Sequence, residues 1–289
     1  MIKKEYLEKV KQIEIQTRRV LSGFMSGDYR TKSRGFGFDF DQLRDYVQGD
    51  DVRFIDWKSS ARTGKTLVRQ YLEDKNRSVY IMVDVSTSVL FADKKDLMSQ
   101  IAAVLALAGF YNKDNVGLIL FSNKILKFVP ARANRQHVLK IIEEIFLDIS
   151  SVNLKSDLTD ISQVIRETMG RLKNNSIVFL ISDFWDLGFN ESLKVFARHH
   201  DVIAISCYKE LEKSLPNIGI LEFEDLESSE KSVLNLSSGI TKRTNIFLKN
   251  FREDFVKFCK QNSIDVLEIN NDKDVINKLI ELFQKRIKI

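Results

Sequence analysis

Cysteine and proline are scarce in this chain, which limits the classes of protein to which it can belong. Its 289 residues include two cysteines and two prolines. Cys207 and Cys259 are too few for a disulfide framework or a metal knuckle, and we expect both to pack as small apolar residues. With so little proline, the chain has no stiff linker, and no internal repeat or low-complexity segment is evident.

Long apolar runs are also absent. No run reaches the roughly 18 residues that a membrane-spanning helix needs. The N-terminus is charged and periodic, unlike a signal peptide. The sequence therefore predicts no transmembrane segment and a cytoplasmic location. With 44% hydrophobic and 29% charged residues, the composition is that of an ordinary globular protein.

The net charge of +5 is unevenly spread along the chain. Residues 1–77 hold 17 Lys and Arg against 12 Asp and Glu, so this segment accounts for the whole surplus. A basic segment can attract nucleic acid, anionic lipid or an acidic protein surface. Because acids and bases are interleaved here, we favour a solvated face. No nucleic-acid partner is expected, since no recognised nucleic-acid-binding motif is present.

Apolar periodicity predicts regular alternation of strands and helices along the chain. Alternation of this kind implies parallel strands joined by crossover helices. We therefore predict an α/β fold with a doubly wound, mostly parallel sheet flanked by helices (residues 76–289), preceded by an N-terminal extension of a helix plus loop and strand (residues 1–75). Strands are expected at 66–73, 78–83, 116–121, 124–129 (antiparallel, at an edge), 176–183, 202–208, 220–223, 233–236 and 266–269, and helices at 2–22, 94–111, 134–149, 159–172, 190–198, 245–261 and 274–288.

Polar side chains follow the most apolar strand, within residues 78–89. Asp84, Ser86 and Ser88 stand two residues apart at its carboxyl end. Thr159 opens a later helix, and Asp183 ends another buried strand. Because the carboxyl ends of parallel strands meet at one edge of a sheet, we expect these five residues to lie close together.

Two carboxylates and three hydroxyls at one edge suit a hard cation, Mg²⁺ or Mn²⁺, and offer nothing to zinc or copper. Close carboxylates repel each other unless one is protonated or a cation lies between them. Taken alone, Asp-x-Ser-x-Ser is also the pattern of a strand end that caps the next helix. The sequence contains three histidines, none beside these residues in sequence, so a Ser–His catalytic pair has little support.

A second stretch of interest is residues 43–62, where acids and arginines alternate around several aromatic and aliphatic residues. Arginine forks bind carboxylates in bidentate geometry, so internal pairing is favoured. One interpretation is a partner-docking surface that includes Arg53, Asp56 and Trp57. The other, slightly favoured by the pairing, is a structural clamp that ties this segment to the main domain.

The five residues at the sheet edge resemble, in order and type, the metal-ion-dependent adhesion site of von Willebrand factor A-like domains. The resemblance implies that Asp84, Ser86, Ser88, Thr159 and Asp183 hold Mg²⁺. The whole chain resembles a prokaryotic von Willebrand A-like family, long described as a domain of unknown function and typically encoded beside MoxR-type AAA+ ATPases. Its most specific signature is Gly-Asp-Asp-x-Arg-x-Ile-Asp-Trp-x-x-Ser-Ala-Arg at 49–62, and the Leu215–Pro216 turn and the Phe283-x-x-Arg286 ending also fit.

This resemblance implies a non-enzymatic protein-binding module. An incompletely coordinated divalent ion leaves a position open for an acidic residue of a client protein, and the partner implied is a MoxR-type AAA+ ATPase that matures client complexes. Two alternatives stay open. One is a metal-dependent hydrolase of phosphate esters, with Asp84 as nucleophile. The other is nucleic-acid binding through the basic N-terminal segment.

Overall fold

The structure describes the chain between Asp39 and Ile287, in ten ranges. It is a computed structural model, and it describes residues 39–47, 50–72, 77–88, 94–151, 159–173, 175–215, 219–224, 231–236, 238–271 and 274–287. The helix predicted at 2–22 and the domain boundary predicted between 75 and 76 lie outside these ranges.

Six strands form one central sheet in the order β10-β7-β6-β3-β4-β5. All neighbouring pairs are parallel except β4 with β5, so the predicted mostly parallel sheet with an antiparallel edge strand is confirmed. The inner strands are almost continuously apolar because both faces of the sheet are covered. Their bounds are β3 (Ser78–Asp84), β4 (Asn115–Phe121), β5 (Ile125–Arg132), β6 (Ile177–Ser182), β7 (Asp201–Cys207) and β10 (Asp265–Ile269).

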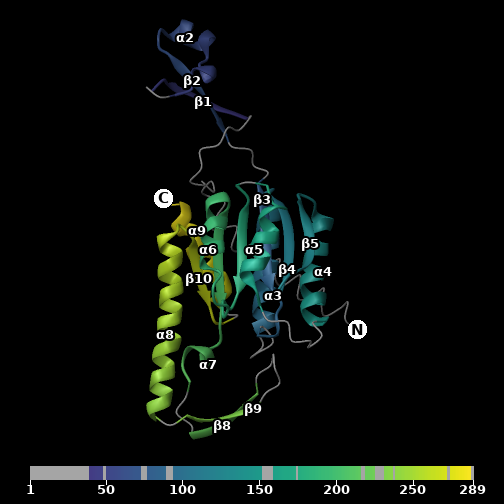
Figure 1. Cartoon of the computed structure of the whole chain (residues 1–289). Coiled ribbons are helices and arrows are strands. Elements are labelled where there is room, and N and C mark those ends of the chain that lie inside the picture. The colour runs from purple at the N-terminus through teal and green to yellow at the C-terminus, as the bar shows by residue number, and fades with distance from the viewer. Residues whose placement is uncertain are drawn as a thin grey trace.

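Helices cover both faces of this sheet. The side chains of β3 alternate between two hydrophobic cores: Val79, Ile81 and Val83 face one, and Tyr80 and Met82 face the other. In Figure 1, α8 stands at the β10 end of the sheet and α4 at the β5 end. The first core contains α3 (Lys94–Tyr111), α4 (Arg135–Ser151) and α9 (Val275–Ile287), and the second contains α5 (Ile161–Met169), α6 (Asn190–His199) and α8 (Ser238–Gln261).

A short helix and a hairpin lie beyond the carboxyl ends of the parallel strands. The helix α7 (Glu210–Lys213) follows directly on β7. The strands β8 (Gly219–Glu224) and β9 (Lys231–Leu236) pair antiparallel, as the sequence predicted. Figure 1 shows this hairpin below the sheet, on the side where α7 lies.

Residues 39–72 form a separate small element, which we call the N-terminal hairpin unit. It contains β1 (Asp39–Asp45), a 3₁₀ turn η1 (Val52–Phe54), α2 (Trp57–Thr63) and β2 (Leu67–Leu72). The strand predicted at 66–73 is β2, and it pairs antiparallel with β1. Figure 1 shows the unit beyond the amino-terminal edge of the central sheet. Within the described ranges, no helix could cross a bilayer.

Candidate functional site

Asp84 is the most deeply buried acid at the carboxyl edge of the sheet, with 0% of its surface exposed. It is the last residue of β3. Its Oδ1 accepts the backbone N–H of Ser86 at 2.9 Å, and its Oδ2 accepts the hydroxyl of Ser182 at 2.7 Å. Ser182 ends the neighbouring strand β6, so the pairing of β3 with β6 brings these two side chains together.

The two serines of the Asp-x-Ser-x-Ser stretch turn toward each other. The Oγ atoms of Ser86 and Ser88 lie 3.0 Å apart. The backbone N–H of Val85 donates to the carbonyl of Phe121 at 2.8 Å, which extends the β3–β4 pairing into the turn. Carboxylate and hydroxyl oxygens are thereby gathered within one short loop, as the sequence predicted.

Asp183 has a cationic partner that the sequence did not indicate. Lys94, the first residue of α3, places its Nζ 2.7 Å from Oδ2 of Asp183 and 2.6 Å from Oε1 of Glu212 in α7. The lysine is 1% exposed. The ammonium therefore links α3, the loop after β6 and α7. It supplies part of the positive charge that the sequence analysis expects from a bound cation.

Burial and mutual repulsion change the proton affinities of this group. Burial, together with repulsion from the Asp183 carboxylate, raises the pKa of Asp84 to about 7, against the hydrogen bonds from Ser86 and Ser182. Burial alone lowers the pKa of Lys94, but the carboxylates of Asp183 and Glu212 outweigh it and the pKa is raised overall. The lysine thus stays charged, whereas burial favours the protonated form of Asp84.

Thr159 lies at the same edge but outside this hydrogen-bonded group. It is half-buried in the segment that leads into α5. The segment is tied to the edge by Asp160, whose N–H donates to the carbonyl of Ser122, and by Ile161, whose N–H donates to Asp186 at 2.8 Å. Asp160 caps α5, so this helix begins two residues later than predicted.

We tested whether these residues suit a divalent cation. Asp84, Ser86 and Ser88 offer only oxygen, the donor that Mg²⁺ and Mn²⁺ take. Among the described residues, no three His, Cys, Asp or Glu side chains are arranged to hold a metal ion, so hydroxyls would have to complete the ligand set. Lys94 pairs with Asp183 and Glu212 only, so a divalent cation beside Asp84 would balance the carboxylate that has no cationic partner among the described residues. The donor set therefore fits a hard cation on the Asp84 side.

Comparison with protein families agrees with this architecture. The model of a family described as "Protein of unknown function DUF58" matches residues 42–255. The chain belongs to the DUF58 family. Uncharacterised proteins of Mycobacterium bovis and Mycobacterium tuberculosis are each 24% identical to it over 283 residues, covering 96% of this chain and 88% of theirs.

Solved structures similar to this DUF58 chain include von Willebrand factor A domains. The conserved hypothetical protein BatB from Bacteroides thetaiotaomicron is 14% identical, with a TM-score of 0.46 over 74% of this chain and 100% of that one. A von Willebrand factor type A protein from Catenulispora acidiphila is 9% identical, with a TM-score of 0.43 over 77% of this chain and 45% of that one.

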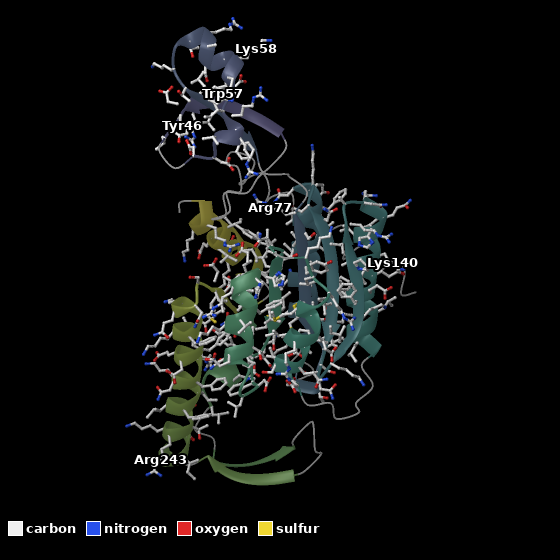
Figure 2. All side chains as sticks on the ribbon, turned by 45° about the horizontal axis from the view of Figure 1, so that its top comes forward. Tyr46, Trp57, Lys58, Arg77, Lys140 and Arg243 are labelled. Carbon is white, nitrogen blue, oxygen red and sulfur yellow. The ribbon has the colours of Figure 1, made fainter. Side chains whose placement is uncertain are left out.

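The DUF58 match includes Arg53, Asp56 and Trp57, the three residues predicted to bind a partner. Their surroundings in the structure differ from one another. Asp56 is buried, accepts the N–H of Ser59 to cap α2, and pairs with Arg69 at 2.9 Å. Arg53 pairs with Asp51, which lies two residues earlier. Trp57, by contrast, is 69% exposed, and Figure 2 shows it on the surface of the hairpin unit.

Sequence reasoning missed Lys94, Glu212 and Ser182. For Lys94 a signal was available: it stands three and four residues before Leu97 and Met98, on the apolar stripe of α3, where a lysine needs a buried partner. Glu212 follows β7 in a short irregular stretch that offers no such periodicity.

Proposed function

We propose that this DUF58 chain is a cytoplasmic, metal-dependent protein-binding module that works as an adaptor with a MoxR-type AAA+ ATPase on client complexes. The observation that supports it most is Asp84: a carboxylate with no cationic partner among the described residues, beside two hydroxyls at the loop edge of the sheet. The ATPase partner rests on the family resemblance given by the 49–62 signature.

In this proposal Asp84, Ser86 and Ser88 hold Mg²⁺ or Mn²⁺, with Thr159 and Asp183 completing the group from neighbouring loops. The ion would supply an open ligand position for an acidic side chain of a client. The residues of the chain have other tasks: Ser182 orients Asp84 through its 2.7 Å hydrogen bond, and Lys94 holds Asp183 in place.

Binding is favoured over hydrolysis by the surroundings of Asp84. An aspartyl nucleophile needs a free, accessible carboxylate oxygen. Asp84 is 0% exposed, and both of its oxygens already accept hydrogen bonds. A phosphate ester cannot reach such a carboxylate for in-line attack, whereas a bare cation needs only the second lone pair that each oxygen keeps.

The test is calorimetric titration of metal-stripped protein with Mg²⁺ and Mn²⁺. Asp84→Asn keeps the shape of the side chain and removes its charge. We expect one binding site in the wild type, lost in this variant. Asp114→Asn is the matched control, because Asp114 also has a pKa raised to about 7 by burial but lies at the opposite edge of the sheet, before β4.

Two results would contradict the proposal. One is the absence of metal binding to the wild type, and the other is equal binding to Asp84→Asn. Hydrolysis of p-nitrophenyl phosphate that disappears in Asp84→Asn and persists in Asp114→Asn would favour the hydrolase instead. The ATPase partnership is tested by co-elution of the chain with a purified MoxR-type ATPase in gel filtration, with and without chelator.

A further inference from the structure

An exposed aromatic surface lies beside the candidate site. Trp185 and Leu187 belong to the loop after β6, and Phe247 and Phe251 belong to α8; we call these four side chains the α8 platform. Leu187 is 82% exposed, Phe247 61% and Trp185 39%. The Trp185 and Phe251 rings stack with centroids 5.0 Å apart and planes 6° from parallel, and Phe247 stacks on Phe251 at 6.3 Å.

The platform is the outer end of a stripe that is otherwise packed. Phe247, Phe251 and Phe255 stand four residues apart and so share one face of α8. Phe255 packs on Phe184 at 4.5 Å and on Phe189 at 5.9 Å in the second core. Toward the N-terminus of α8 the same stripe leaves the core and meets solvent. Large aromatic rings left in water in this way mark a contact surface.

The platform is continuous with the candidate site along the chain. Asp183, Phe184 and Trp185 are consecutive, and Phe184 has a left-handed backbone with φ of 57°. This turn is fixed by hydrogen bonds from the N–H of Phe184 to Ser182 and of Trp185 to Asp183. It directs Asp183 toward Lys94 while the next two rings pack on α8. A single turn of the chain therefore links Asp183 of the site to Trp185 of the platform.

Positive charge lies at the N-terminal end of α8, next to Phe247 along the helix. From Ser238 to Arg252, α8 contains four Lys and Arg and no Asp or Glu; Glu253 and Asp254 follow, and Glu253 pairs with Lys249. Lys242 and Arg243 are exposed and pair with no residue that the structure describes. Figure 2 shows Arg243 at the end of α8 that extends past the sheet, pointing outward. These two exposed cations favour an acidic group at the Phe247 end of the platform.

We propose that the α8 platform docks a segment of a partner protein that combines acidic residues with apolar side chains. The apolar side chains cover Trp185 and Phe247, and the acidic residues lie near Lys242 and Arg243. This inference rests on the proposed function in one respect. One acidic residue of the docked partner segment would be the carboxylate that fills the open ligand position of the proposed metal site.

The experiment measures fluorescence anisotropy of a labelled peptide rich in Glu with a few Leu and Phe residues. Matched peptides carry Lys in place of Glu, or Ser in place of the apolar residues. The variants are Phe247→Ser, the double variant Lys242→Glu/Arg243→Glu, and the control Leu126→Ser, an exposed apolar residue on β5 that is 49% exposed. Because Phe247 is mostly exposed, the Phe247→Ser variant should fold, and a melting curve verifies this.

We expect the acidic, apolar peptide to bind the wild type and Leu126→Ser equally. Phe247→Ser should weaken binding by about tenfold, as loss of an aromatic anchor does. Lys242→Glu/Arg243→Glu should weaken it by at least as much and remove its salt dependence. Equal binding of the Lys-containing peptide, equal binding by Phe247→Ser, or no binding to the wild type at millimolar peptide overturns the proposal.

Other occupants give distinct results that also overturn it. Dimerisation in sedimentation that is lost in Phe247→Ser would assign the platform to a second copy. Retention on anionic lipid vesicles that is lost in Phe247→Ser would assign it to a membrane. The metal site is tested separately with Asp84→Asn: peptide binding that survives this variant and chelator but not Phe247→Ser supports the platform while the metal proposal fails.

Discussion

The N-terminal hairpin unit and the carboxyl-edge site differ in how their carboxylates are paired with cations. In the hairpin unit each of three carboxylates has its own arginine near the surface. At the carboxyl edge one ammonium pairs with two carboxylates, and a third, buried carboxylate has no cationic partner among the described residues. The pairs in the hairpin unit are Asp50 with Arg44, Asp51 with Arg53 and Asp56 with Arg69; at the carboxyl edge Lys94 pairs with Asp183 and Glu212, and Asp84 is the third carboxylate.

This difference separates structural charges from candidate functional ones. Exposed pairs contribute roughly 0–1 kcal/mol each, so the one-to-one pairs mainly set the shape of the hairpin unit. Buried carboxylates in excess over cations raise the energy of the folded state, and such arrangements cluster at functional sites. The comparison therefore favours the carboxyl edge as the metal site and limits the role of the hairpin unit to its exposed residues, Trp57 above all.

The largest expected effect is that of Lys94→Met. It leaves Asp183 and Glu212 buried without a cation, which should lower the free energy of unfolding by about 3–5 kcal/mol in the presence of chelator. Urea denaturation measures this loss. Lys94→Met/Glu212→Gln removes one of the two orphaned carboxylates and should recover part of it. Unchanged stability of Lys94→Met would mean that the ammonium does not balance the group.

Asp114→Asn sharpens the comparison, because Asp114 is a half-buried acid that does have a nearby cation, Arg77. Burial raises the pKa of Asp114 from 3.8 to about 7, with Arg77 opposing the increase. Since the folded state holds this proton more tightly than the unfolded state, its contribution to stability is full below about pH 4 and is lost as the pH rises to about 7.

The neutral variant lacks this dependence. We expect Asp114→Asn to gain stability over the wild type between about pH 4 and 7 and to keep a constant advantage above that. Chemical denaturation at several pH values checks the difference curve. A difference that does not vary with pH would show that Asp114 titrates normally.

The smallest expected effect is local. Asp56→Ala removes the cap of α2 and the partner of Arg69, so amide hydrogen exchange in residues 57–63 should accelerate by about tenfold. Exchange in the central sheet should not change, nor should metal binding. Asp51→Ala is the control, since its pair with Arg53 is exposed. If Asp56→Ala changed amide hydrogen exchange in the central sheet or abolished metal binding, the hairpin unit and the carboxyl edge would be coupled.

The sheet and its crossover helices could be predicted because the signals are local. The apolar runs of β3 and β6 and the apolar stripe of α3 depend only on burial, and the parallel pairing follows from the alternation of strands and helices. Asp84, Ser86 and Ser88 lie together because they are two residues apart in one loop. The Lys94–Glu212 contact could not be predicted, because it depends on where α7 lies after β7.

In the hairpin unit, β1 and α2 could not be predicted from apolar periodicity. In β1 a bulge between Phe40 and Gln42 interrupts the alternation on which a strand prediction relies. In α2 the sequence Trp-Lys-Ser-Ser-Ala-Arg-Thr has no apolar stripe. Its boundary signals were nonetheless present: Asp56 caps the start, and Gly64 ends the helix with φ of 73°.

The stacking of Trp185 on Phe251 gives the protein a built-in optical reporter. The chain has two tryptophans, one in each of the regions compared above. Replacing Trp57 with phenylalanine would leave a single indole, two residues from Asp183 and in contact with α8. The emission of that indole would then follow events at the carboxyl edge directly in solution, without any label attached to the protein.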